Sequence, residues 1–406
     1  MGIKKHSKER KMKRILVLTS TFPRWRSDTV PRFVYDLSTR YVQCGYKVDV
    51  IAPHSYQAMR REEMGDISVY RYKYFFNRYQ NLAYGGGIIA NLKKQPLNYL
   101  LIPFFLLFQF LAILQRLKQS KYDLIHAHWL IPQTFICLLI LKYIIRDRIP
   151  VLCTCHGSDL YVLNGPFFTA LKRWVVMNCA HVCVVSKTMR DDLLKLGIKS
   201  GAVSISPMGV DLQNLFVPIN SVTRYEGRII FVGRFVLQKG VDLLIEALGI
   251  VRKSFPRVEM ILVGDGPVRT PLEEKVSNSE LNNNVRFMGA VSHEKLPELY
   301  SSAIIAVVPS VGNEGLGLVM IEAMGCGCAV IASALGPIME VIEHEQTGLL
   351  FEPGNADDLA RQILRLLKEP GLVQSVARNG ILKVREQFDW TIIAQRYYDL
   401  IEHICS

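Results

Sequence analysis

Two cations follow the end of an apolar run in the second half of the chain. The segment 231–240 reads FVGRFVLQKG, so an expected strand ends near Gly233 and the loop after it carries Arg234 and Lys239. Arginine binds phosphate through two parallel N–H groups and lysine acts as a point charge, so the pair could clamp a diphosphate. The alternative is a solvated loop between strand and helix. We favour the clamp because both cations follow the carboxyl end of a strand.

A glycine-rich helix start provides a second phosphate site. In the segment 313–325, NEGLGLVMIEAMG, glycines precede an expected helix whose free N–H groups and positive dipole end can receive a phosphate. Glu314 precedes this helix, and Glu322, eight residues later, could accept hydrogen bonds from a ribose diol. The alternative is that both are surface acids. The residues expected around a bound nucleotide here are Gly315, Leu316, Gly317, Leu318 and Val319.

Two weaker patterns lie between these motifs. The segment 262–267, LVGDGP, places Gly264 in a turn after a strand, and a later strand ends near Phe287 and Met288. Backbone groups at that strand end could bind a nucleobase. Taken singly, both patterns are typical of structural turns. In order with the two cations and the helix start, they outline a nucleotide pocket.

Polar side chains in the first half could contact a sugar and its acceptor. His156 follows a strand in the segment CHGSD, and His128 ends a neighbouring strand beside a tryptophan. A histidine at such a place is more often structural; the functional interpretation is a sugar contact for His156 and an acceptor contact for His128. The loop after the first strand carries Arg24, Asp28 and Arg32, which would suit a phosphorylated acceptor. The alternative is again a solvated loop.

These residues follow strands in both halves of the chain. They can act on one ligand only if the carboxyl ends of the strands in two sheets face each other. Short apolar runs alternate with helical patterns, which is typical of parallel sheets built from strand–helix–strand units. Residues 216–227 are polar and lack a helical period, so we expect a linker there between domains over 1–217 and 218–387. The predicted fold is α/β, with two Rossmann-like domains and a ligand cleft between them. The expected strands are Arg14–Thr19, Lys47–Ala52, Asp123–His126, Val151–Thr154 and His181–Val185, then Arg228–Val232, Glu259–Val263, Val285–Met288, Ile304–Val308 and Ala329–Ala332.

Length and charge narrow the function classes. A chain of 406 residues exceeds one ordinary domain. Residues 1–220 hold 31 Lys/Arg against 13 Asp/Glu, a net charge of +18, and the remaining 18 against 23 give −5. This asymmetry suits a membrane surface or a phosphorylated ligand; no zinc-finger or RNP-type motif is present, so we expect no nucleic-acid partner. The nine cysteines lack zinc-site spacing, so we expect reduced thiols and no metal.

The segment 97–117 is the most apolar in the chain. It reads LNYLLIPFFLLFQFLAILQRL, which is about long enough to cross a bilayer. Three interpretations stay open: a buried helix, an interfacial helix lying against lipid headgroups, and a membrane-spanning helix. Flanking lysines and arginine would suit an anionic leaflet; they are Lys93, Lys94, Arg116, Lys118 and Lys121. No signal-peptide core follows the basic first residues, so we expect a cytoplasmic protein, peripheral on the inner face of the cell membrane.

The order of these motifs resembles the retaining glycosyltransferases of family 4, which have the GT-B fold, over nearly the whole chain. Glu314 and Glu322 match the family's E-x7-E. The G-R…K-G loop of the family is matched at Gly233, Arg234 and Lys239, and its active-site histidine at His156. The segments 207–211 (PMGVD) and 325–333 (GCGCAVIAS) are similar to two further family motifs. One departure is the first loop, where Ser27-Asp28-Thr29 replaces the usual Gly-Gly pair.

The resemblance implies transfer of a hexosyl unit from a nucleoside diphosphate sugar to a glycan or a polyprenyl- or lipid-linked acceptor, with retention at the anomeric carbon. Arg234 and Lys239 would stabilise the leaving diphosphate without a metal, while Glu314 would hold sugar hydroxyls and His156 the far side of the ring. No cofactor is implied, and the family favours a UDP-sugar over a GDP-sugar.

The resemblance also implies membrane docking, a role in surface-polysaccharide or glycolipid synthesis, and a helix over 388–406 that crosses back to the first domain. Two alternatives stay open. A nucleotide-sugar epimerase of the same fold would form product without an acceptor. A non-catalytic membrane-binding protein would explain the charge alone.

Overall fold

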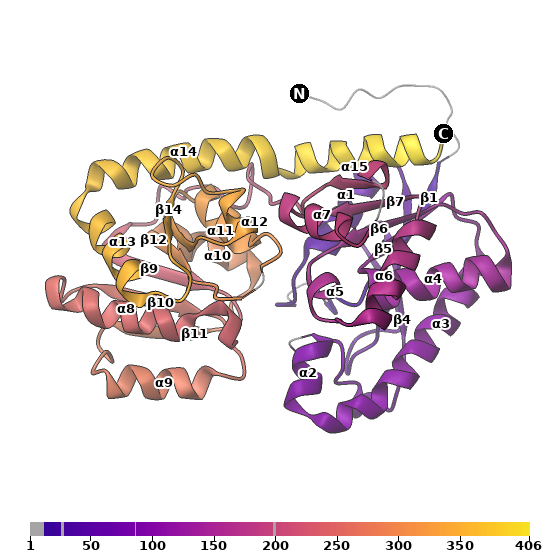
Figure 1. Cartoon of the computed structure of the whole chain (residues 1–406), viewed down its shortest axis with the longest axis horizontal. Coiled ribbons are helices and arrows are strands. Elements are labelled where there is room, and N and C mark those ends of the chain that lie inside the picture. The colour runs from indigo at the N-terminus through magenta and orange to yellow at the C-terminus, as the bar shows by residue number, and fades with distance from the viewer. Residues whose placement is uncertain (1–11, 26–27, 86, 198–199, 313) are drawn as a thin grey trace.

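The chain folds into two α/β domains that lie side by side and are bridged by the C-terminal helices (Figure 1). A computed structural model describes residues 12–25, 28–85, 87–197, 200–312 and 314–406. Each domain is built around one sheet, and nearly every strand pairing is parallel. The prediction of two parallel-sheet domains is therefore confirmed.

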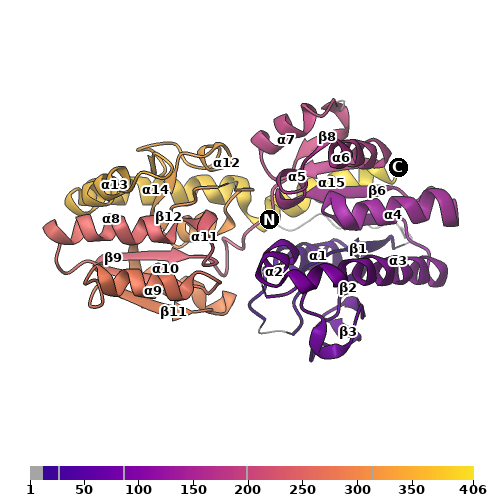
Figure 2. The ribbon, with the colours of Figure 1, turned by 60° about the horizontal axis from the view of Figure 1, so that its bottom comes forward.

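The first sheet has eight strands in the order β3-β4-β2-β1-β5-β6-β7-β8. Its one antiparallel pairing joins β3 to β4, and β3 lies at the outer edge (Figure 2). The sequence did not lead us to expect β3, β4 or β8. The strands are β1 (Arg14–Leu18), β2 (Lys47–Pro53), β3 (Arg61–Met64), β4 (Ile67–Tyr72), β5 (Leu124–His128), β6 (Val151–Cys155), β7 (His181–Val184) and β8 (Val203–Ile205).

Alternate residues of the central strands pack on opposite faces of this sheet, because successive side chains of a strand point in opposite directions. Ile15 and Val17 pack with apolar side chains of α1 (Phe33–Gln43) and α15 (Trp390–Ile404). Leu16 and Leu18 belong to the core on the other face, which includes α3 (Ile102–Gln119) and α6 (Pro166–Asn178). Both faces are therefore covered, as a parallel sheet requires.

The second sheet has six parallel strands in the order β11-β10-β9-β12-β13-β14. Strand β9 begins at Tyr225, inside the segment 216–227 that we expected to be linker. The last strand, β14, was also not expected from the sequence. The strands are β9 (Tyr225–Val232), β10 (Glu259–Val263), β11 (Val285–Gly289), β12 (Ala303–Val308), β13 (Ala329–Ser333) and β14 (Leu349–Phe351).

The remaining α-helices complete the two domains. In the first domain they are α2 (Ile88–Lys94), α4 (Phe135–Leu139), α5 (Ser158–Tyr161) and α7 (Lys187–Leu194). In the second they are α8 (Val241–Ser254), α9 (Arg269–Asn278), α10 (Leu296–Ser302), α11 (Leu318–Gly325), α12 (Gly336–Met339), α13 (Ala356–Lys368) and α14 (Pro370–Phe388).

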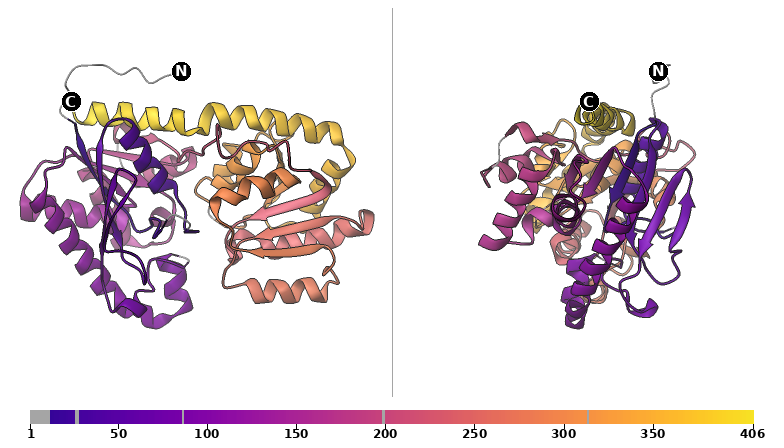
Figure 3. Two further views of the ribbon diagram at one scale, coloured as in Figure 1. Left: turned by 180° about the vertical axis from the view of Figure 1, so that it is seen from behind. Right: turned by 90° about the vertical axis from the view of Figure 1, so that its right-hand side faces the viewer.

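Helices α14 and α15 run almost end to end from the second domain across to the first (Figure 3). They are separated only by Asp389, whose side chain caps α15 by accepting a hydrogen bond from the Thr391 N–H group at 2.9 Å. Gly209 makes room for this crossing, since an ideal Cβ there would lie 2.6 Å from the ring of Trp390. The last helix is thus held against the first domain.

Candidate functional site

The two domains meet where strands of both sheets end. Arg32, before α1, forms an ion pair with Glu294 of the second domain. The carboxylate of Glu340, which follows α12, accepts hydrogen bonds from the backbone N–H groups of Lys187 at 2.6 Å and Thr188 at 2.8 Å. An ideal Cβ on Gly315 would lie 2.9 Å from the His156 carbonyl oxygen. The loops that carry the predicted site residues therefore meet between the two domains, where the sequence predicted the ligand cleft.

The predicted diphosphate clamp follows β9. Arg234 keeps an exposed surface, and no described carboxylate forms an ion pair with it. Loss of hydration lowers the pKa of its guanidinium from the usual value. The side chain reaches toward the first domain, because an ideal Cβ on Gly87 would lie 4.0 Å from Arg234 Nη1. Arg234 is a positive charge without a counter-charge in the cleft.

Lys239 and Glu314, expected to act on different parts of a ligand, form one ion pair. Lys239 Nζ lies 2.6 Å from Glu314 Oε2, and the Ser310 hydroxyl donates to the same oxygen at 2.9 Å. Both charged side chains are partly exposed. An anion that binds Lys239 must therefore compete with Glu314 for its ammonium group.

Two glycines near the clamp let strand ends pack backbone to backbone. An ideal Cβ on Gly264 would lie 1.9 Å from the Gly233 carbonyl oxygen, and one on Gly240 would lie 2.0 Å from the Pro309 carbonyl oxygen. Both have a positive φ, +138° and +62°, which disfavours other residues. These contacts give Gly264 a structural explanation that is independent of any ligand.

The helix α11 begins at Leu318, with Gly317 at its N-cap in the left-handed conformation. Leu316 is buried, and Leu318 and Val319 are partly buried against the core. The Glu314 side chain lies close to this helix start, because an ideal Cβ on Gly317 would lie 3.8 Å from Glu314 Cγ. The predicted phosphate-binding helix start thus lies beside the Lys239–Glu314 pair.

Glu322 lies deeper than its predicted role in binding a ribose suggests. It is 6% exposed, and its two carboxylate oxygens contact His293 Nε2 at 3.2 Å and the Tyr300 hydroxyl at 3.4 Å. Burial alone would lower the pKa of His293, but the hydrogen bond to Glu322 and the charges of Glu322 and Asp36 raise it. The sequence offered no signal for His293, which is one residue in a short polar stretch after β11.

The predicted nucleobase contacts lie on β11, at the edge of the second sheet. Met288 is 39% exposed, so its side chain is open to contact. Phe287 is partly buried and packs edge-to-face against Phe235, with ring centroids 6.1 Å apart. Of these two side chains, Met288 is the more accessible.

His156 follows β6 and packs against the rings of Phe33 and Trp129, each 4.8 Å away between centroids. Loss of hydration lowers its pKa to about 3, so the imidazole is neutral at neutral pH. The carboxylate of Asp159 accepts hydrogen bonds from the backbone N–H groups of His156 at 3.2 Å and Leu130 at 2.8 Å, which ties the ends of β6 and β5 together.

His128 has a different place from the one we expected. It is 1% exposed and bonds through Nδ1 to His156 Nε2 at 2.9 Å, so it lies behind His156 and does not reach an acceptor. Burial, together with the neighbouring histidines His126 and His156, lowers its pKa well below the usual value. The prediction of an acceptor contact is corrected to a contact with His156.

The predicted acceptor residues in the first loop also have protein partners. The guanidinium of Arg24 bonds both carboxylate oxygens of Asp28 at 2.7 Å and stacks on Trp25, and Asp28 is 4% exposed. Burial opposes ionisation of Asp28, but the bonds from Arg24 outweigh it and lower its pKa. Arg32 bonds Glu294. Arg24 and Asp28 thus bind each other, and Ser27, in the departure from the family pattern, lies outside the described residues.

Within the described part of the chain, no cluster of three or more His, Cys, Asp or Glu side chains has the geometry of a metal site. Every cysteine is a free thiol.

Two family models match the chain. Glycosyltransferase Family 4 matches residues 30–214, and Glycosyl transferases group 1 matches residues 221–383. An uncharacterized glycosyltransferase of Methanocaldococcus jannaschii is 30% identical over 295 residues, which cover 68% of this chain and 74% of that protein. The gpi3 subunit of the phosphatidylinositol N-acetylglucosaminyltransferase of Schizosaccharomyces pombe is 24% identical over 379 residues, 92% of this chain and 77% of that protein.

Solved structures share the fold over the whole length. Sucrose-phosphate synthase from Thermosynechococcus elongatus has a TM-score of 0.79 at 25% identity, covering 97% of this chain and 99% of that one. HepE of Anabaena, solved in complex with UDP and glucose, has a TM-score of 0.73 at 20% identity and covers 96% and 100% of the two chains.

Proposed function

The chain belongs to the family 4 glycosyltransferases, and from this premise we propose that it transfers a hexosyl unit from a nucleoside diphosphate sugar to a glycan or a polyprenyl- or lipid-linked acceptor. We propose retention at the anomeric carbon, no metal, and UDP rather than GDP as the carrier. The similar fold of HepE, which was solved with UDP and glucose, supports this choice of nucleotide. A role in surface-polysaccharide or glycolipid synthesis follows from such an acceptor.

The observation that carries this proposal is the unpaired Arg234 at the end of β9. A guanidinium without a counter-charge in a cleft is held ready for an anion, and negative charge grows on the leaving diphosphate as the glycosidic bond breaks. The acceptor oxygen bonds to the anomeric carbon while the bond from that carbon to the diphosphate oxygen breaks. The acceptor proton passes to the leaving phosphate, so the reaction needs no separate base.

The other site residues support the same chemistry. Because His156 is neutral, it can hydrogen-bond the sugar without repelling the positive charge that develops on the ring. A diphosphate that binds Lys239 draws its ammonium group away from Glu314, and the freed carboxylate can then accept hydrogen bonds from sugar hydroxyls. Donor binding and the positioning of Glu314 are thus linked through one ion pair.

Turnover tests the proposal. UDP-hexoses and GDP-hexoses are incubated with the protein, with and without a membrane lipid extract, and nucleotide release and sugar products are measured. We expect nucleotide release that depends on the extract and falls at least about 100-fold in Arg234→Gln, as for loss of one transition-state contact. Arg257→Gln is the control, because Arg257 is an exposed arginine at the far end of β10 from the cleft. Epimerised sugar without an acceptor would instead indicate the isomerase, and no reaction would contradict the proposal.

The acceptor side of the proposal rests on the surface of α3 and the turn before it. Residues 96–119 form the one described helix long and apolar enough to span a membrane. Its most apolar stretch of 18 residues has a mean hydropathy of 2.1, yet only 28% of that stretch is buried. The inward face packs on the sheet, where Phe105 is 1% exposed and contacts the ring of Tyr74. The membrane-spanning interpretation fails because a helix with one face packed on its own domain cannot be surrounded by lipid. The buried-helix interpretation fails because most of this helix is exposed. We propose the interfacial arrangement.

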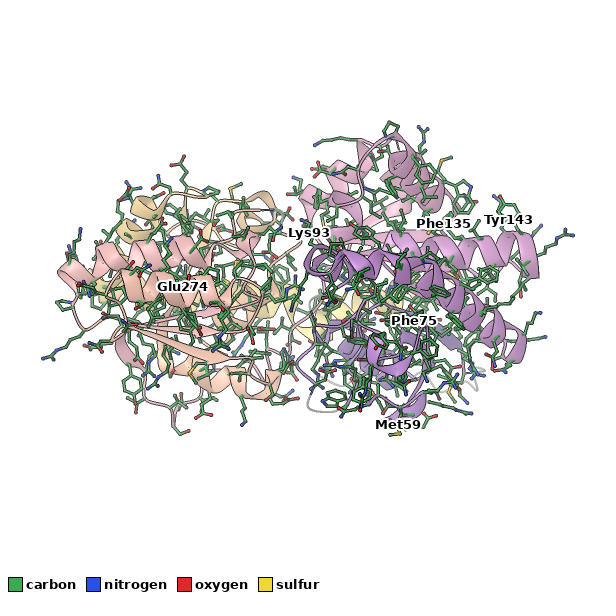
Figure 4. All side chains as sticks on the ribbon, turned by 90° about the horizontal axis from the view of Figure 1, so that it is seen from below. Met59, Phe75, Lys93, Phe135, Tyr143 and Glu274 are labelled. Carbon is green, nitrogen blue, oxygen red and sulfur yellow. The ribbon has the colours of Figure 1, made fainter. Side chains whose placement is uncertain are left out.

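The outward face is suited to anionic headgroups. Leu97, Leu100 and Leu107 are 78%, 69% and 50% exposed. Figure 4 views the molecule from below, the side on which this helix lies. Lys93 is labelled near the boundary between the domains, and Tyr143 at the outer end of the first domain. Lys93, Lys94, Lys118 and Lys121 are exposed, whereas Arg116 bonds Asp49 and is not available. Exposed apolar side chains in a segment flanked by exposed lysines match a negatively charged leaflet.

Vesicle sedimentation tests this arrangement. We expect the protein to bind vesicles containing phosphatidylglycerol but not vesicles of pure phosphatidylcholine. Leu107→Glu should bind at least about tenfold more weakly than the wild-type protein, because burying one leucine contributes about 1.5–3 kcal/mol. Leu382→Glu is the matched control, since Leu382 is 52% exposed on α14 of the other domain. Equal binding of the two variants would refute the proposed membrane face.

A further inference from the structure

Three histidines stack behind the cleft at the ends of β5 and β6. The rings of His126 and His128 have centroids 4.3 Å apart, and those of His128 and His156 are 5.2 Å apart with an interplanar angle of only 22°. His126 and His128 are almost fully buried, while His156 is partly exposed. Only the last of the three can reach a ligand in the cleft.

The hydrogen bonds around His126 fix its proton. The carbonyl oxygen of Ser206 can only accept, so the Tyr397 hydroxyl, 3.2 Å away, must donate to it. The oxygen of Tyr397 then accepts from Thr154, 3.2 Å away, and Thr154 accepts from His126 Nε2 at 2.8 Å. His126 therefore carries its proton on Nε2, and its Nδ1 accepts from the Tyr41 hydroxyl at 2.9 Å.

One hydrogen bond joins His128 to His156. Both imidazoles are neutral at neutral pH, so each carries a single N–H group. The contact between His128 Nδ1 and His156 Nε2 at 2.9 Å needs one donor and one acceptor. Nδ1 is then the one ring nitrogen of His156 without a described hydrogen-bond partner.

We propose that His128 is a positioning residue for His156: its Nδ1 holds the His156 ring in one orientation and one tautomer, so that Nδ1 of His156 is presented to the sugar. This inference rests on the proposed function, because it assigns His156 to the sugar. Thr154 links His126, whose ring contacts that of His128, to Tyr397 of α15, so the C-terminal helix supports this cluster of histidines.

Two substitutions separate hydrogen bonding from packing. His128→Phe keeps an aromatic ring of similar shape but removes Nδ1, whereas His128→Asn places an amide atom near the position of Nδ1. We expect kcat to fall about 100-fold in His128→Phe with the donor KM changed less than twofold, since a misplaced catalytic group has an effect of about that size. His128→Asn should recover at least tenfold of that loss. Equal kcat in the two variants, or an unchanged kcat in His128→Phe, would overturn the inference.

Nitrogen-15 NMR of the histidine rings tests the inference without turnover. In the wild-type protein we expect the His156 ring nitrogens, assigned with His156→Gln, to show one tautomer at pH 7. In His128→Phe they should show a mixture of tautomers. Identical His156 signals in the two proteins would overturn the positioning role even if the enzyme is active. A changed tautomer in a protein without turnover would support the positioning role and contradict only the proposed function.

Discussion

Replacing Glu340 by glutamine should shift the two domains toward an open arrangement. Its carboxylate accepts three hydrogen bonds from the first turn of α7 in the other domain: from the N–H groups of Lys187 and Thr188 and from the Thr188 hydroxyl, at 2.6, 2.8 and 2.8 Å. Glutamine keeps one accepting oxygen but loses the charge, and it brings an NH2 group to a helix end whose own N–H groups already point outward.

The size of the effect follows from the loss of that charge. An anion at a helix N-terminus contributes about 0.3–1 kcal/mol, and up to about 2 kcal/mol when partly buried. A hydrogen bond to a charged group contributes about 1.5–3 kcal/mol, part of which glutamine retains. We therefore expect a loss of about 1–2 kcal/mol, which changes the ratio of closed to open molecules about 5- to 30-fold. The Arg32–Glu294 ion pair remains, so the domains should not separate completely.

Small-angle scattering and single-molecule energy transfer between dyes on α9 and α6 would measure this shift. We expect a larger radius of gyration and a low-transfer population in Glu340→Gln. Glu343→Gln is the matched control, because Glu343 is paired with Lys383 inside the second domain. Profiles that are the same for both variants would refute the assignment of Glu340 as an interdomain contact.

Two further predictions concern stability. Gly264→Ala should lower the melting temperature by several degrees, because its Cβ would lie 1.9 Å from a backbone oxygen, whereas Gly371→Ala on α14, with nothing within 4 Å, should leave it unchanged or raise it; equal melting temperatures would contradict the packing account. The pKa values of His126, His128 and His156 are lowered in the folded protein, to about 3 for the first and last, so on acidification the unfolded chain takes up these protons first. The free energy of unfolding should therefore be unaffected by these histidines above about pH 6.5. Below that pH it should fall by about 1.4 kcal/mol per pH unit for each histidine, down to about pH 3. Urea unfolding at pH 7 and pH 5 measures this, and equal stability at the two values would contradict it.

The strands that carry the site could be predicted because parallel strands buried on both faces are continuous apolar runs. The run RILVL before the first loop became β1, which begins at Arg14 as expected, and the run AIIAVV before the glycine-rich segment became β12, which ends at Val308 as expected. The strand β3, by contrast, has the sequence REEM and lies at a sheet edge. Its polar residues gave no strand signal. An edge strand pairs with only one other strand and is less buried, so its side chains need not be apolar.

The contacts between site residues could not be read from the sequence. Lys239 and Glu314 are 75 positions apart, and their ion pair depends on how β9 and β12 place two loops. His128 was expected at the cleft because it ends a strand, yet the ring of His156 covers it. No sequence pattern indicates which of two neighbouring strand ends carries the side chain that lies nearer the cleft. Arg32 was expected at an acceptor, but its partner Glu294 belongs to the other domain.

Nucleotide binding is the most direct test of the central claim that Arg234 awaits a diphosphate in this cleft. The melting temperature of the wild-type protein, Arg234→Gln and Arg257→Gln would be measured with UDP, GDP and ADP. We predict a rise of several degrees with one nucleotide, UDP, that persists in Arg257→Gln and disappears in Arg234→Gln. No rise with any nucleotide, or a rise that is the same in all three proteins, would contradict the account.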